Sequence, residues 1–384
     1  MKNLLYKTVG IVLGVGIALF LCSCTQKENV DIKTPDQIKR ELADLKNEDK
    51  VSEKETTQPK EEPKEEPKEE PKKDTTLVFT GDIMPYDSVL NIYRSDGIDG
   101  IVGKSIQNVL KNADITMVNQ EFPFSTRGTK APDKQFTFRI HPSHVTLMQD
   151  LGVDIVSLAN NHSLDFGPDA LNDTFDTLDK GKIRYAGAGA SEERARELQI
   201  LEKNGKKFGF LASSRVIPVS AWDVRYNAPG VFTTYDPQDL LEDINAAKSE
   251  CEFLTVFIHW GIERAERPEA YQITMAKQYI DAGADLVIGS HPHVLQGFEF
   301  YKGKPIVYSL GNFIFNTSIP STVALKVQVK KDNRASLKIV PAKAVNGKTQ
   351  EMKDSEKREL YKYLQGISNG ISIKRGKIDS DYEN

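Results

Sequence analysis

Residue types that bind metal ions gather in five short clusters of the sequence. The clusters are Gly81–Met84, Asn119–Glu121, Asn160–Asp165, His259–Gly261 and His291–His293. Among them are three imidazoles suited to binding metal, two carboxylates and a side-chain amide. Mixed nitrogen and oxygen ligands of this kind suit divalent transition ions such as Mn²⁺, iron, Zn²⁺ or Co²⁺. The sequence therefore predicts a site for one or two divalent ions.

Each cluster taken alone has a simpler interpretation. Asp82 after a glycine is usually part of a turn, Glu121 alone would be a surface acid, and His259 alone would be a core histidine. The pair His291 and His293 is harder to explain in this way, because residues i and i+2 of an extended segment point to the same side. The joint occurrence of the clusters favours a metal site.

The clusters follow stretches that have the features of buried strands. Apolar runs predict strands at Leu77–Thr80, Ile115–Val118, Asp154–Leu158, Leu254–Ile258 and Leu286–Ile288. Helices are predicted at Ser143–Leu151, Pro168–Leu178 and Glu269–Ala282, each with a glycine near its end. This alternation is typical of an α/β fold. Because open α/β folds place ligands at the carboxyl ends of strands, we expect the clusters to meet there.

Hairpins are mixed with these units. The predicted pairs are Gln199–Lys203 with Lys206–Leu211, Phe298–Tyr301 with Pro305–Leu310, and Val323–Val329 with Ala335–Val340. So many strands predict two packed sheets with helices outside. A last helix at about 355–365 is expected to dock Leu360 and Leu364 on the domain, and the tail after Gly370 is expected to fray.

The N-terminus has the features of a lipoprotein signal peptide at residues 1–24. Two lysines precede an apolar run that is short for a membrane-spanning helix, which needs about 20 residues. Leu21, Ser23 and Cys24 resemble a bacterial lipobox, so Cys24 is expected to carry the lipid. An uncleaved signal anchor is the alternative. Either interpretation places the rest of the chain outside the cytoplasm.

A charged segment follows at residues 25–75. It contains Pro-Lys-Glu-Glu three times in succession, starting at Pro59, Pro63 and Pro67. Such a composition cannot bury enough apolar surface to fold, so we predict a disordered linker that holds the domain away from a membrane. The net charge of the whole chain is −4, so nothing indicates a nucleic-acid partner.

Cysteines and histidines outside the clusters have simpler expected roles. Cys22 would be removed with the signal peptide and Cys24 lipidated, which leaves Cys251 without a partner and excludes a disulfide framework. Cys251 is expected to be a buried, inert thiol. His141 and His144 are expected to be structural or surface residues.

The clusters in their order resemble the calcineurin-like metallophosphoesterases, and more closely the bacterial capsule synthesis CapA family of poly-γ-glutamate biosynthesis. The similar segments are Thr80–Met84, Val118–Glu121, Ser157–Gly167, His259–Glu263, Ala282–Gly297 and Tyr308–Phe315. The resemblance implies a four-layer α/β/β/α sandwich for a domain at residues 76–345, followed by a C-terminal helix and tail at 346–384.

The resemblance also implies a role for each site residue. Asp82 and His293 would bind one ion, and Asn161, His259 and His291 a second, with Glu121 bridging the two. His162, oriented by Asp165, would donate a proton to the leaving group of a phosphoester. Met84 stands where that pattern has a ligand histidine, and Glu121 replaces the usual aspartate. The first ion would therefore lack a ligand, which weakens the expectation of vigorous phosphoesterase activity.

Three functions remain open from the sequence. The first is a capsule protein whose metal site binds an anionic envelope polymer such as poly-γ-glutamate during synthesis or export. The second is an active metal-dependent phosphoesterase, or another hydrolase, that acts on an envelope polymer. The third is a structural metal site in an adhesion domain, which the open position at strand ends disfavours. Any translocation channel would belong to a separate membrane-embedded capsule synthesis protein.

Overall fold

The computed structural model describes residues 73–381. The expected signal peptide, the lipidation site Cys24 and nearly all of the expected linker lie outside these residues. Within residues 73–381, no helix is both long enough and apolar enough to cross a membrane.

Ten strands in the described part of the chain form the first sheet. Their order is β17-β18-β15-β14-β1-β2-β3-β4, with β13 beside β1 and β16 beside β15. They are β1 (Thr75–Ile83), β2 (Ile115–Gln120), β3 (Ile155–Ser157), β4 (Arg184–Ala186), β13 (Asn312–Ile314), β14 (Ser318–Val329), β15 (Ala335–Val345), β16 (Lys348–Glu351), β17 (Ile371–Lys374) and β18 (Lys377–Ser380). Strands β1 to β4 are parallel to one another, and β14 pairs antiparallel with β1.

The second sheet has six strands in the order β11-β12-β10-β9-β7-β6. They are β6 (Gln199–Lys203), β7 (Lys206–Ser214), β9 (Phe253–His259), β10 (Leu286–Ser290), β11 (Phe298–Tyr301) and β12 (Lys304–Val307). The four central strands are parallel, and the two edge strands come from the predicted hairpins. Two short strands, β5 (Ala188–Gly189) and β8 (Gly230–Val231), form a separate pair.

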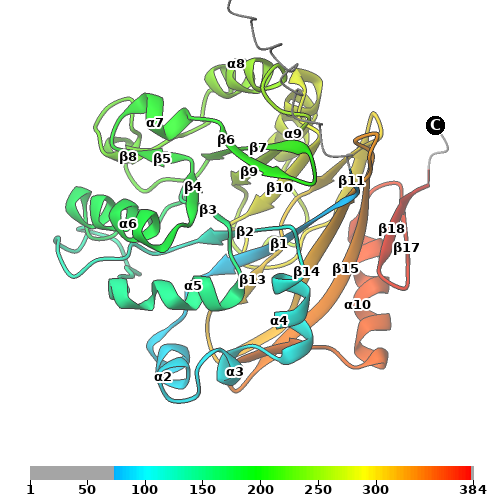
Figure 1. Ribbon diagram of the computed structural model, residues 1–384, viewed down its shortest axis with the longest axis horizontal. Helices are drawn as coiled ribbons and strands as arrows, with labels where there is room; N and C mark the ends of the chain where they lie inside the picture. The colour runs from blue at the N-terminus through cyan, green and yellow to red at the C-terminus, as the bar shows by residue number, and fades with distance from the viewer. Residues whose placement is uncertain (1–72, 382–384) are drawn as a thin grey trace, which may run out of the picture. The chain divides into compact units, whose positions relative to one another are not determined.

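Helices cover the outer face of each sheet (Figure 1). Those on the first sheet are α2 (Asp87–Asp96), α3 (Ile98–Ile101), α4 (Lys104–Lys111), α5 (Val145–Leu151) and α6 (Pro168–Gly181). Those on the second are α7 (Glu192–Arg196), α8 (Gln238–Ala247) and α9 (Ala270–Ala282). Two 3₁₀ turns, η1 (Pro142–His144) and η2 (Ser220–Trp222), lie in connecting loops.

The two sheets pack face to face through an apolar cluster that lies between them, which we call the inner cluster. Two further apolar clusters lie between each sheet and its helices. On β1, Leu77 and Phe79 belong to this inner cluster, whereas Val78 packs against the helices. This alternation follows from the two-residue period of a strand. Phe210 and Phe257 face the same inner cluster from the second sheet. The four-layer α/β/β/α arrangement that the resemblance implied is therefore confirmed.

Residues 371–380 of the C-terminal tail form strands and do not fray, so the expectation was wrong for this part of the tail. After α10 (Asp354–Ile367), the strands β17 and β18 form a hairpin that pairs with β15 in the first sheet. Ile371, Ile373 and Ile378 are at most 9% exposed and pack in the inner cluster. Burial of this apolar side of the hairpin offsets the entropy lost in ordering it. The expected docking of Leu360 and Leu364 is confirmed, because both are buried in the same cluster.

Candidate metal centre

The five clusters lie at the carboxyl ends of parallel strands, as expected, and both sheets contribute. The end of β1 pairs with the end of β2 and with the start of β13, which places Asp82 opposite Asn119 and Asn312. The last residue of β9, His259, is paired with Ser290 at the end of β10. Close approach at this edge requires Gly81, because a Cβ atom there would lie 1.6 Å from the carbonyl oxygen of Gly311.

Asp82, Glu121 and His293 form the first group of possible ligands. Their donor atoms all lie within 4.8 Å of one another. The Nδ1 atom of His293 is 3.2 Å from Oδ2 of Asp82 and 4.0 Å from Oε2 of Glu121. Both carboxylates are fully buried. Two neighbouring buried carboxylates are costly without a compensating cation, so this arrangement suits a divalent ion.

The remaining predicted ligands adjoin this group. The Nε2 atom of His259 is 3.0 Å from Oδ1 of Asn161, and its Nδ1 atom is 3.4 Å from Oε1 of Glu121. The ring of His291 lies with its centroid 4.6 Å from that of His259 and 5.9 Å from that of His293. The structure therefore brings all six predicted metal ligands into one site.

The segment His291–His293 does not have the extended backbone that the sequence predicted. The φ angles of His291 and His293 are 98° and 60°. Such left-handed values are unfavourable for residues with a side chain, and they concentrate at functional sites. The two imidazoles reach the site through a tight turn after β10 rather than through the alternation of a strand.

Two buried side-chain atoms that could bind a metal lack another hydrogen-bond partner in the described part of the chain. Oε2 of Glu121 and Nδ1 of His291 have no hydrogen-bond partner among the described residues. Buried polar atoms are rarely left without a partner unless something else binds them. A divalent ion that accepts carboxylate and imidazole ligands supplies that partner, so the residues present fit such an ion.

The pKa shifts of the carboxylate and imidazole groups at the site also suit a bound metal ion. Burial, and then the neighbouring Asp82, raise the pKa of Glu121 well above its usual value. Burial opposes protonation of His293, but Glu121 and Asp82 outweigh it and raise the pKa of His293 to about 10. Burial lowers the pKa of His291 to about 4, with His293 adding to the effect, and lowers that of His259 well below its usual value. Neutral imidazoles are the form that binds metal.

His162 and Asp165 form the predicted pair beside the metal ligands. The Nδ1 atom of His162 lies 2.8 Å from Oδ2 of Asp165, and both side chains are buried. Because Asp165 accepts from Nδ1, Nε2 is the nitrogen left to exchange a proton with a substrate. Burial lowers the pKa of His162, although Asp165 opposes the effect.

Lys134 is a residue of this site that sequence reasoning missed. Its ammonium group donates hydrogen bonds to the carbonyl oxygen of Asn161 and to Oδ1 of Asp165, and it lies 3.0 Å from Nδ1 of His162. Burial lowers the pKa of Lys134, and the charge of Asp165 opposes the shift. Lys134 lies in a long loop without periodic pattern, so no sequence signal pointed to it.

Two asparagines were also missed as site residues. The Nδ2 group of Asn119 donates to Oδ1 of Asp82 at 2.8 Å and to Oε1 of Glu121 at 2.9 Å. The Oδ1 atom of Asn312 lies 2.9 Å from Nδ1 of His293. Asn119 lies near the end of β2 and Asn312 begins β13, both at the same edge as the ligands. The strand-end position was therefore a signal that could have found Asn119.

Other expectations about single residues hold. Met84 is buried in the apolar cluster between the first sheet and its helices and offers no ligand. Cys251 is a free, buried thiol. His141 and His144 lie at the surface, where the Nδ1 atom of His141 accepts a hydrogen bond from the backbone of Ser143.

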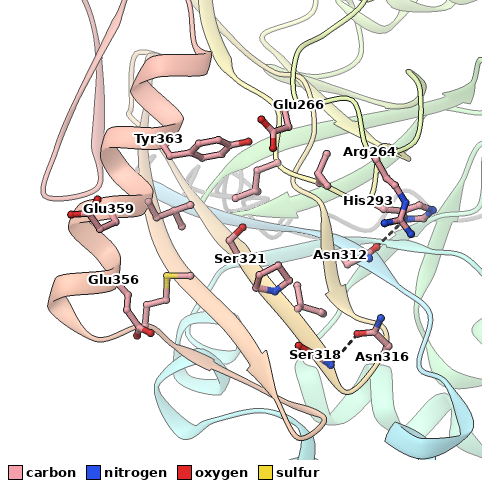
Figure 2. Close-up of a pocket in the computed structure, with 16 residues that line it drawn as sticks. Arg264, Glu266, His293, Asn312, Asn316, Ser318, Ser321, Glu356, Glu359 and Tyr363 are labelled. Atoms are coloured by element: carbon pink, nitrogen blue, oxygen red, sulfur yellow. Dashed lines mark hydrogen bonds between the residues drawn. The ribbon is translucent and has the colours of Figure 1, made fainter.

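A hollow of about 720 Å³ opens beside the metal ligand His293 and its neighbour Asn312 (Figure 2). It runs between the start of β14 and the helix α10. Arg264 lies at the metal end, as Figure 2 shows, whereas Glu266, Glu359 and Tyr363 stand farther along it. We call this hollow the metal-side groove. It gives a ligand of more than a few atoms access to the site.

Comparison with known proteins gives consistent similarities. A sequence model of the family described as bacterial capsule synthesis protein PGA_cap matches residues 76–317. The chain is 29% identical over 300 residues to the capsule biosynthesis protein CapA of Bacillus anthracis, covering 75% of this chain and 72% of that protein. It is 30% identical over 268 residues to the PGA biosynthesis protein CapA of Bacillus subtilis strain 168, covering 68% and 70%. A solved structure titled a novel phosphatase, from Mycoplasma pneumoniae, aligns with a TM-score of 0.47 at 12% identity, covering 76% and 99%.

Proposed function

Because the chain belongs to the bacterial capsule synthesis family PGA_cap, we propose that it acts in the synthesis or export of capsular poly-γ-glutamate through a metal-dependent hydrolytic centre. The relatives in Bacillus are named for capsule and PGA biosynthesis. The observation that carries the hydrolytic part is the convergence of Asp82, Glu121 and His293 within 4.8 Å. The adjoining pair His162 and Asp165 supplies a proton donor.

The residues divide into two tasks under this proposal. The divalent ions are held by two sets of ligands, of which the first is Asp82 with His293 and the second is Asn161 with His259 and His291. Glu121 lies between the two sets. When bound, the ions polarise the scissile bond and activate water, and Mn²⁺, iron and Zn²⁺ all suit this ligand set. The buried position of the carboxylates keeps them ordered and dry, which strengthens their interaction with a cation.

The second task is proton transfer at Nε2 of His162. Asp165 accepts from Nδ1 and so fixes the tautomer and the plane of the ring. Lys134 binds both Asp165 and the carbonyl of Asn161, which ties the proton donor to a metal ligand. The bond that is cleaved belongs to an envelope polymer or its precursor, with a phosphoester as the first substrate class to test.

A second candidate function is coordination of the anionic polymer without turnover. Met84 supports it, since this residue is buried in the core, at the position where the metallophosphoesterase pattern that the sequence resembles has a ligand histidine. A site that lacks one ligand has room for the carboxylates of a polymer. The two candidates share their metal ligands and differ in the need for His162.

The location of the protein is also part of the proposal. We infer a lipid anchor at Cys24 from the sequence preceding it. The domain would then act at the outer face of the cell membrane, where a capsule polymer emerges.

The test uses the full chain loaded with Mn²⁺ and a panel of phosphomonoesters and phosphodiesters. His162→Ala should abolish turnover while the metal content, measured by elemental analysis, stays unchanged. His141→Ala removes a surface imidazole and is the matched control, which should keep full activity. Turnover that persists in His162→Ala would refute the assigned proton donor. Bound metal without turnover in the unaltered protein would favour the second candidate.

A further inference from the structure

A row of four lysines crosses four neighbouring strands of the first sheet. Lys326 of β14 is paired with Lys338 of β15, Lys338 with Lys377 of β18, and Lys377 with Lys374 of β17. Residues directly opposite each other on neighbouring strands point to the same face. With about 4.8 Å between strands, the row is about 14 Å long. We call these four residues the lysine row.

The lysine row is costly for the fold. Like charges placed directly opposite each other destabilise a sheet. Lys377 pairs with Asp379 at 2.6 Å, but no ion pair to Lys326, Lys338 or Lys374 forms within residues 73–381. Lys338 also interacts electrostatically with Glu351. The row is therefore only partly compensated inside the domain, and its remaining positive charge is available to bind a ligand.

Two adjoining hollows extend this charge. Lys326 and Lys338 line a hollow of about 590 Å³, together with Arg358 and Arg375. Arg358 and Arg375 also line a second hollow of about 580 Å³, which continues to Lys362. The two hollows adjoin each other, because Arg358, Tyr361 and Arg375 line both. We call the pair of hollows the basic groove.

The acidic groups in the basic groove are fewer than its basic groups. Glu351 and Asp354 are its two carboxylates, and both pair with Lys357, at 2.5 Å and 3.6 Å. The other five basic residues lining the two hollows, Lys326, Lys338, Arg358, Lys362 and Arg375, form no ion pair among the described residues. The groove therefore has a clear excess of positive charge.

The helix α10 separates the basic groove from the metal-side groove, and the two differ in charge. Glu356 and Glu359 of α10 line the metal-side groove together with Glu266. Arg358 and Lys362 of the same helix line the basic groove. Figure 1 shows α10 beside β17 and β18 at this edge of the domain. Glu356 forms an ion pair with Lys343, and Arg264 also lines the metal-side groove, so that groove lacks the excess of positive charge that would attract a long polyanion to the other side of α10.

We propose that the basic groove with the lysine row binds a linear polycarboxylate, a stretch of the polymer chain itself. The identity of this ligand rests on the proposed role in poly-γ-glutamate synthesis or export. Charge complementarity supports a polyanion, and the regular spacing of the lysines suits a chain with one carboxylate on every unit. The concave walls suit a chain and not a membrane, because a flat bilayer does not enter two hollows. The metal site then receives a separate substrate or a chain end.

The experiment measures binding of fluorescent poly-γ-glutamate to the full chain by anisotropy at low and at physiological salt. The variant Lys326→Gln/Lys338→Gln/Lys374→Gln removes three unpaired charges of the row. An ion pair between an exposed lysine and a carboxylate of the polymer contributes modestly to binding. The joint loss of three such pairs should therefore weaken binding about tenfold and reduce its dependence on salt. The matched control, Lys180→Gln/Lys207→Gln/Lys331→Gln, removes three exposed lysines outside the groove and should bind as the unaltered protein does.

The outcomes separate this proposal from the metal-dependent function. Equal weakening in both triple variants, or none in either, would overturn the basic groove as the binding site. Binding to vesicles containing phosphatidylglycerol, without binding to the polymer, would assign the surface to a membrane and overturn the proposal. His259→Ala should leave polymer binding unchanged, since the basic groove does not include the metal ligands. If the unaltered protein binds the polymer but has no hydrolytic activity, the result would refute only the proposed hydrolytic function and not the basic groove.

Discussion

The Nε2 atom of His259 lies 3.0 Å from the Oδ1 atom of Asn161, although the two residues are 98 positions apart in the chain. His259 ends β9 of the second sheet, whereas Asn161 follows β3 of the first. The candidate metal centre is therefore built across the junction of the two sheets. An ion bound there connects the sheets, so metal binding and stability of the fold are coupled.

The first prediction concerns that coupling. Mn²⁺ at 100 times its dissociation constant should stabilise the folded protein by about 2.7 kcal/mol, because the ion binds only the folded state. Thermal unfolding of the full chain with Mn²⁺, and again after chelation, measures the effect. His259→Ala should lose the response and His141→Ala should keep it. A His259→Ala protein that gained as much stability from Mn²⁺ as the unaltered chain would rule His259 out as a ligand.

The second prediction concerns Lys134. Asp165 is fully buried, and its carboxylate binds the ammonium group of Lys134. Lys134→Met leaves that charge without its cation, which should lower the free energy of unfolding by about 3 kcal/mol. Denaturant titration measures it, with Lys130→Met, an exposed lysine of the same loop, as the control. Adding Asp165→Asn to Lys134→Met should cost less than the sum of the two single changes. Additive costs would contradict a direct interaction.

Much of the site and the central part of the fold could be predicted because the site residues are close in sequence to the strands that position them. The strands β1, β2, β3, β9 and β10 are apolar runs, and each is followed closely by an acidic residue, an asparagine or a histidine of the site, so strand and site residue appear together in the sequence. The rule that ligands lie at the carboxyl ends of parallel strands was enough to expect the clusters to meet, whereas the six individual ligands were assigned through the family resemblance. That rule placed Asp82 and His293 in one site although 211 residues separate them in the chain.

The residues that escaped prediction depend on contacts that leave no local pattern. Lys134 reaches Asp165 across 31 positions from an irregular loop. The helix α8 has only Leu240, Ile244 and Ala247 buried, which is too short a periodic signal to separate it from a loop. The hairpin β17–β18 has strands of four residues, and its burial depends on the edge that β15 offers.

The third prediction tests the C-terminal hairpin. Ile378 is 2% exposed and packs in the cluster between the sheets. Ile378→Ala should therefore lower the free energy of unfolding by about 2 to 5 kcal/mol, as expected for removing a large aliphatic side chain from a core. Lys374→Ala, an exposed change in the same hairpin, should stay within about 0.5 kcal/mol. Equal, small effects of both changes would mean that the hairpin does not dock on the sheet in solution.

The last prediction concerns the thiol of Cys251. Burial raises its pKa from 9.0 to about 11, so the folded state keeps the thiol protonated to higher pH than the unfolded state does. Its contribution to stability is fully present below pH 9 and is lost as the pH rises through 11. Since the thiolate is the nucleophile, alkylation by iodoacetamide at pH 8 should be about 100-fold slower in the folded than in the unfolded chain. Mass spectrometry of the peptide containing Cys251 measures both rates. Similar rates in the two states would show that the thiol is accessible and not held in the core beneath β7.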